Sequence, residues 1–191
     1  FPYTTLFRSL HNLGGGTAKT VFASIISRYQ DPDGDLGISD EGWEIAAKFL
    51  GNAHNIADGE DAVGSVIDGT YPMDEHWASG VLTEQKDRDY KFQIMTPDIG
   101  EPYVVESLAI SAGTKKYDTC VAFLNWLGSS DVQLDWSNNY GTIPCQKEAL
   151  AQVSDDIKEL METLKPQDLD WSFIAENVDA WVEKAELEYV Q

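Results

Sequence analysis

Apolar side chains recur every three or four residues in several stretches of the chain. This spacing places them on one face of a helix, so it predicts amphipathic helices that each bury one stripe. The predicted helices span about 17–29, 40–50, 62–67, 117–127, 156–164 and 171–189. Ser39 is a predicted N-cap, and Asp58 with Asp61 resembles a capping box.

Three other stretches alternate apolar and polar residues, which is typical of strands. They are residues 70–77, 90–97 and 103–111, and Pro72 favours an edge position for the first. Residues 141–145 are expected to be extended. Helices that alternate with short strands predict an α/β fold.

Composition and charge narrow the range of functions. Of 191 residues, 42% are apolar, which is enough for a packed core, and the net charge is 13 − 33 = −20. Nucleic acid binding needs clustered Lys and Arg, so that class is excluded. No apolar run approaches the roughly 20 residues of a membrane helix. The two cysteines form no CxxC pair, and Cys120 is expected in the core.

The glycines at 14–16, followed by Thr17 and Ala18, form the first candidate site. Glycines let a backbone approach a ligand closely, and the helix that follows offers free N–H groups and a partial positive charge. Gly15, Gly16, Thr17 and Ala18 therefore predict a site for phosphate, phosphonate or carboxylate. The structural alternative is a glycine-rich linker before a helix with Thr as its N-cap.

Glu75, His76 and Trp77, at the end of a predicted strand, form the second candidate site. The Glu carboxylate can accept hydrogen bonds, the His imidazole can donate a hydrogen bond or bind a metal, and the Trp ring offers apolar contact area to a ligand. The alternative is a strand end that alternates between solvent and core. His11, His54 and His76 are far apart in the sequence, so no metal site is expected, and no cofactor is expected either. No catalytic motif is present, so the chain is not expected to be an enzyme.

Several ordered segments together resemble one protein family. They are GGGTAKTVFASII at 14–26, VIDGTYPM at 66–73, the run from MTPDIGEPY to SSDVQ at 95–133, YGTIPC at 140–145 and DWSFIAENVDAWVEKAE at 170–186. They resemble the second half of bacterial ABC-transporter solute-binding proteins with the type II periplasmic-binding-protein fold. The most similar subgroup binds iron, 2-aminoethylphosphonate, hexose phosphates or polyamines. Ala78 stands about where that subgroup carries a Glu, so that contact is not transferred.

The resemblance implies a truncated two-lobed α/β fold. Residues 10–98 would form part of the second lobe, and residues 99–191 the C-terminal segment of the first. Residues 1–9 look like a translated sequencing adapter, and the family's upstream half and signal segment would be missing. The segment after residue 99 is therefore expected to expose apolar surface, and this chain to bind its ligand weakly.

The resemblance also implies a function. The protein would be the substrate-binding component of an ABC importer, monomeric, in the periplasm or anchored at the cell surface as a lipoprotein, and a membrane permease would be its partner. It would capture a small anionic solute between its lobes, with Glu101 and Tyr103 near the hinge as further ligand-binding residues. Ferric iron stays open as the solute, although no matching Tyr pair is found. The same scaffold would also suit an effector-binding domain of a transcription regulator or an enzyme, because a fold does not fix a function.

Overall fold

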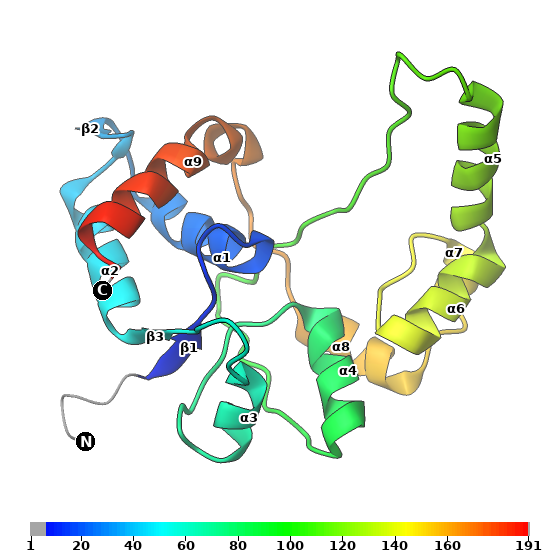
Figure 1. Cartoon of the computed structure of the whole chain (residues 1–191), viewed down its shortest axis with the longest axis horizontal. Coiled ribbons are helices and arrows are strands. Elements are labelled where there is room, and N and C mark those ends of the chain that lie inside the picture. Colours follow the sequence, from blue (N-terminus) through cyan, green and yellow to red (C-terminus); the bar gives the residue numbers. More distant parts are fainter. Residues whose placement is uncertain (1–6, 191) are drawn as a thin grey trace. The chain divides into compact units, whose positions relative to one another are not determined.

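A computed structural model describes residues 7–190, and its backbone contacts divide the chain into two compact units (Figure 1). Unit 1 comprises Phe1–His76 and Asp168–Gln191, and unit 2 comprises Trp77–Gln167. This division differs from the predicted boundary at residue 98, because the C-terminal helix packs with the N-terminal part of the chain. The assignment of either unit to a lobe stays a prediction.

Unit 1 contains short strands, a 3-10 turn and four helices among its described residues. They are β1 (Arg8–Leu10), α1 (Gly16–Ile26), η1 (Ser27–Tyr29), β2 (Gln30–Asp35), α2 (Asp40–Gly51), β3 (Ala53–Asn55), α3 (Ala62–Ile67) and α9 (Trp171–Glu188). The predicted N-cap is confirmed, since the Ser39 hydroxyl accepts a hydrogen bond from the Gly42 N–H. Asp61 is the N-cap of α3, since its carboxylate accepts from the Gly64 N–H, whereas a capping box would have made Asp58 the cap.

A small parallel sheet lies at the start of unit 1. Strands β1 and β3 pair in parallel, with Arg8 opposite Ala53 and Leu10 opposite Asn55 (Figure 1). Met73 forms an isolated parallel bridge to Arg8 on the other side. The predicted strand at 70–77 is therefore reduced to one bridge. Arg8 and Ser9 belong to this sheet, although the prediction placed residues 1–9 outside the fold; residues 1–6 lie outside the described part.

The core of unit 1 is one cluster that joins the sheet to three helices. It contains Leu10, Leu13, Ala18, Phe22, Ala23, Ile26, Ile38, Trp43, Ala46, Leu50, Ala53, Ile174, Trp181, Val182 and Ala185. Trp181 of α9 is completely buried, and its Nε1 donates to the Leu36 carbonyl over 3.0 Å. The helix α9 thus closes the core against α1, as its apolar stripe predicts.

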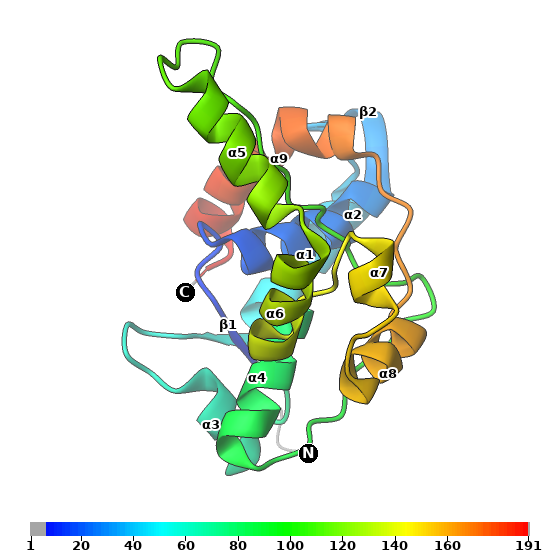
Figure 2. The same ribbon diagram turned by 90° about the vertical axis from the view of Figure 1, so that its right-hand side faces the viewer.

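Unit 2 contains five helices, with a long connection between the first two and short connections between the others. They are α4 (Ala78–Arg88), α5 (Tyr117–Leu127), α6 (Ser130–Tyr140), α7 (Lys147–Leu150) and α8 (Asp155–Thr163). The helix α6 packs against α4 and α7 (Figure 2). Few apolar side chains of this unit are buried: Ala149, Val153, Ile157 and Leu160. The helix α5 contains no buried residue, so Cys120 is half-buried rather than in the core as predicted.

The strands predicted at 90–97 and 103–111 do not form in the described chain. An alternating segment becomes a strand only when a neighbour pairs with it, and no partner segment lies beside either stretch. Val104 and Val105 are consequently 62% and 77% exposed. The predicted apolar exposure after residue 99 is therefore confirmed. The predicted alternation of helices and strands is found only in part, because the described chain is rich in helices and forms few strands.

Candidate functional site

The candidate anion site is the N-terminus of α1, which follows directly after β1. Leu10 ends the strand, and the chain then turns through Asn12, whose side chain and carbonyl accept the N–H groups of Gly14 and Gly15 over 2.7 and 2.8 Å. Gly15 is the N-cap of α1, with φ −77° and ψ 149°, and no side chain caps the helix. The alternative of an ordinary Thr N-cap is therefore wrong.

The first turn of α1 has backbone N–H groups that make no helical hydrogen bond. The first helical hydrogen bond runs from the Lys19 N–H to the Gly15 carbonyl, so the N–H groups of Gly16, Thr17 and Ala18 precede the helical ladder. A Cβ placed on Gly16 would meet no atom within 4 Å. Amides outside the helical ladder, the positive helix end and the open space beside Gly16 together form a suitable environment for an anion.

Glu75 follows shortly after Met73, the residue that bridges to Arg8, and its carboxyl group interacts with the charge of Arg8. Burial raises the pKa of the Glu75 carboxyl to about 7, while the positive charge of Arg8 opposes that rise and the Asp74 charge adds to it. Arg8 donates from Nη2 to the Phe49 carbonyl, and its guanidinium lies 3.5 Å from the centroid of the Phe49 ring. Desolvation lowers the pKa of Arg8 itself. Glu75 is therefore a buried acid that can change charge near neutral pH.

His76 joins a cluster that the sequence did not reveal. His11 Nε2 lies 3.6 Å from Asp74 Oδ1, and His76 Nδ1 lies 3.8 Å from Asp74 Oδ2. The two imidazole rings are 6.4 Å apart between centroids. The structure thus corrects the expectation for His11 and His76, because the parallel bridge between Arg8 and Met73 brings the segment after residue 73 alongside the end of β1.

The remaining predicted residues belong to unit 2. Trp77 is the N-cap residue of α4 and is 55% exposed. The Glu101 carboxylate accepts from the Lys165 N–H over 3.0 Å, and its backbone pairs with residues 165–167. Tyr103 is one-third exposed, and burial raises its pKa. Glu101 therefore has a structural partner within its own unit, and the role of these three residues in ligand binding stays a prediction.

Arg8, His11 and Asp74 are site residues that sequence reasoning missed. Residues 1–9 were interpreted as a translated adapter, so no strand was predicted at β1. His11, which follows this strand, was therefore not recognised as a residue at a strand end. A short strand before a glycine-rich helix start would have been the signal, because ligand-binding groups gather at the carboxyl ends of parallel strands.

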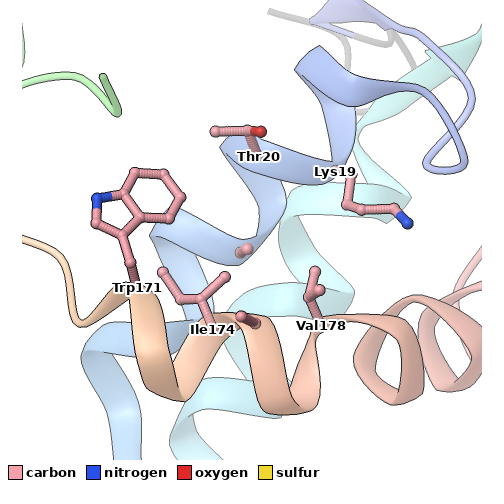
Figure 3. A pocket seen from close by; sticks show the side chains of 7 residues that line it. Lys19, Thr20, Trp171, Ile174 and Val178 are labelled. Carbon is pink, nitrogen blue, oxygen red and sulfur yellow. The ribbon is translucent and has the colours of Figure 1, made fainter. Parts of the chain in front are cut away.

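A separate cavity of about 240 Å³ lies between α1 and α9 (Figure 3). It is lined by Lys19, Thr20, Ala23, Trp171, Ile174, Ala175 and Val178. Figure 3 shows the Trp171 ring at one end and the Lys19 amine at the other. Lys19 also pairs with Asp179 over 2.9 Å. The cavity is mainly apolar and lies outside the predicted sites.

Residues 7–165 match the family model described as bacterial extracellular solute-binding protein. The chain is also 33% identical over 175 residues to the probable ABC transporter periplasmic-binding protein y4fP of Sinorhizobium fredii. This alignment covers 92% of the chain and 48% of the relative, so the chain spans about half the length of the curated relative. No solved structure matches the chain significantly.

Proposed function

Because the chain belongs to the bacterial extracellular solute-binding protein family, we propose that it is part of the substrate-binding component of an ABC importer. The similarity to a probable ABC transporter periplasmic-binding protein supports this role. The proposed role is capture rather than catalysis, in the periplasm or at the cell surface, as a monomer that delivers solute to a membrane permease. None of the described helices is long and apolar enough to cross a bilayer.

The proposed solute is a small anion of the phosphate, phosphonate or carboxylate class. The observation that carries this proposal is the uncapped start of α1, where three amides precede the helical ladder and the space beside Gly16 is open. Hydrogen bonds to a charged acceptor are stronger than those between neutral groups, so backbone amides alone can hold such an anion.

The acidity of the chain does not oppose this proposal strongly. The net charge of −20 slows the approach of an anion, but charges in solvent are largely screened beyond about 8 Å at physiological salt. Burial also raises the pKa of Glu75 to about 7, so below that pH this carboxyl adds no negative charge to unit 1. The free amides of α1 can therefore dominate at short range.

Gly16→Pro tests this proposal, because proline at the first helical position removes one amide donor and is tolerated by the helix. The extended conformation of Gly15 also suits a residue before proline. Gly16→Ala is the matched control, since it adds a methyl group in open space and keeps the N–H. The measurement is an NMR titration of the 191-residue chain with inorganic phosphate and with 2-aminoethylphosphonate, which detects weak binding.

We expect shifts of the Thr17 and Ala18 amides in the unmodified chain. The apparent affinity should fall about 10-fold or more in Gly16→Pro, as expected for one hydrogen bond to a charged group, and by less than about threefold in Gly16→Ala. Equal affinities of the two variants would refute the amide site. If a panel of phosphonates, sugar phosphates and carboxylates neither shifts these amides nor raises the melting temperature, the proposed solute class is wrong.

A further inference from the structure

We propose that His11, Asp74 and His76 bind a divalent transition-metal ion of the Zn²⁺ class. One potential ligand atom from each residue lies within 4.8 Å of the other two. Two imidazole nitrogens and one carboxylate oxygen form a donor set that suits zinc and its neighbours better than magnesium or calcium. This inference does not depend on the proposed solute, since it uses different atoms and a ligand of opposite charge.

Backbone pairing positions the three residues of the cluster. His11 follows β1 directly, and Asp74 follows Met73, the residue that bridges to Arg8 of β1. The two residues therefore leave neighbouring parallel segments at the same end. His76 lies two residues further along, so an extended backbone places it on the same side as Asp74. The site is thus built on paired backbone rather than on independent loops.

Asp74 is oriented by a neighbour, as metal-binding carboxylates usually are. The Ser9 hydroxyl donates to Asp74 Oδ1, and the Ser9 side chain is fully buried in the sheet. A hydrogen bond of this kind fixes the carboxylate and lowers the cost of ordering it on binding. The Asp74 side chain is only 7% exposed, so its charge has little access to water.

Buried polar atoms give an independent reason to expect a ligand. Within residues 7–190, His11 Nε2 and Asp74 Oδ2 are inaccessible to solvent and have no hydrogen-bond partner. Such atoms are rare in folded proteins, and an ion is one of the explanations for them. The ion pairs of 3.6 and 3.8 Å are too long for hydrogen bonds and leave room between the groups.

The required adjustment is small. Tetrahedral ligands about 2.0–2.2 Å from zinc lie roughly 3.4 Å from one another. Each imidazole nitrogen already lies near this distance from one of the two Asp74 oxygens, at 3.6 and 3.8 Å, and one ligand atom from each residue lies within 4.8 Å of the other two. Small side-chain rotations would therefore bring the three groups to one ion. Three protein ligands leave a fourth position for water or an exogenous donor, as in open zinc sites.

Calorimetric titration of the 191-residue chain with Zn²⁺ tests the inference, in a buffer with 150 mM NaCl and 5 mM Mg²⁺. Magnesium occupies sites made of carboxylates alone, so the remaining signal reports imidazole-containing sites. We expect one zinc ion per chain, with affinity reduced at least 10-fold in His11→Gln, Asp74→Asn and His76→Gln. His54→Gln is the matched control, because His54 lies in the same unit and pairs with Glu60 instead; its affinity should change less than twofold.

A measurement on the unmodified chain guards against variants that fail to fold. Zinc should protect His11 and His76, but not His54, from modification by diethylpyrocarbonate. X-ray absorption of the zinc complex should show two imidazoles. Protection of His54 alone, undiminished affinity in any of the three cluster variants, or no zinc binding at 1 mM would overturn the inference. The phosphate titration of Gly16→Pro would be unaffected by that failure, so the two proposals are tested separately.

Discussion

The two units use similar helical patterns but differ sharply in how much apolar surface they bury. In unit 1, α9 carries Trp181 and Ala185 into a core shared with α1 and α2, and both side chains are fully buried. In unit 2, α5 carries Phe123 and Trp126, which are 52% and 53% exposed. Both helices are rich in aromatic residues, so composition does not explain the difference.

The difference in buried apolar surface depends on whether another element packs against each helix. The helix α9 returns from the far end of the sequence to cover the stripe of α1, whereas the described chain provides no layer over the face of α5. An amphipathic pattern therefore determines where a helix forms, and tertiary packing determines whether that helix is stable. We infer that unit 1 carries most of the folding free energy of this chain.

The largest expected effect is that of Trp181→Ala, compared with Trp126→Ala. Removing a fully buried tryptophan leaves a cavity and an unpaired Leu36 carbonyl, so unfolding of unit 1 should become easier by about 3–5 kcal/mol. The exposed Trp126 should cost about 0.5 kcal/mol or less. Urea unfolding followed by circular dichroism, with hydrogen exchange of α1 and α9, measures both. Equal losses would contradict the contrast between the units.

The next effect is a dependence of unit 1 stability on pH through Glu75. Its pKa is raised from 4.5 to about 7 in the folded chain, so the folded state binds its proton more tightly than the unfolded state. Stability contributed by the protonated form is present below about pH 4.5 and is lost as pH rises to about 7. The full loss is about 3 kcal/mol.

Glu75→Gln is the matched variant, because it keeps the shape of the side chain and removes the titration. The unfolding free energy of the unmodified chain should fall relative to that of Glu75→Gln between pH 4.5 and 7, and then remain parallel to it. EDTA in the buffer removes any contribution from bound metal. A constant difference across this range would show that the carboxyl group is not buried as described.

Local features of unit 1 could be predicted from the sequence, because they depend on neighbouring residues. The helix α2 begins after Ser39 and ends at Gly51 as predicted, and Asp170 caps α9 through the N–H groups of Ser172 and Phe173. The glycine-rich start of α1 was also visible, since a turn and a helix start need no distant partner. Sequence reasoning was therefore most accurate where the interactions were short-range.

The rest depends on pairing between distant segments. His11 and Asp74 meet only because Met73 lies beside Arg8, and no pattern in the sequence specifies that register. The segment 103–111 has a strand pattern but lacks a pairing partner in the described chain, so it stays extended and exposed. The helix α4 was missed because its apolar positions are few and its polar residues many.

The smallest effect compares two serine N-caps, one in each unit. Ser39 accepts the Gly42 N–H over 3.3 Å at the start of α2, whereas Ser154 at the start of α8 makes no side-chain capping bond. Ser39→Ala should therefore destabilise unit 1 by about 1 kcal/mol, and Ser154→Ala should change stability by less than about 0.5 kcal/mol. Thermal unfolding and amide exchange of the first turns of α2 and α8 provide the measurement. The first variant removes a bond within a packed helix, while the second removes only a hydroxyl group from a loosely packed one. A larger loss from Ser154→Ala would mean that unit 2 depends on local capping more than its few buried contacts indicate.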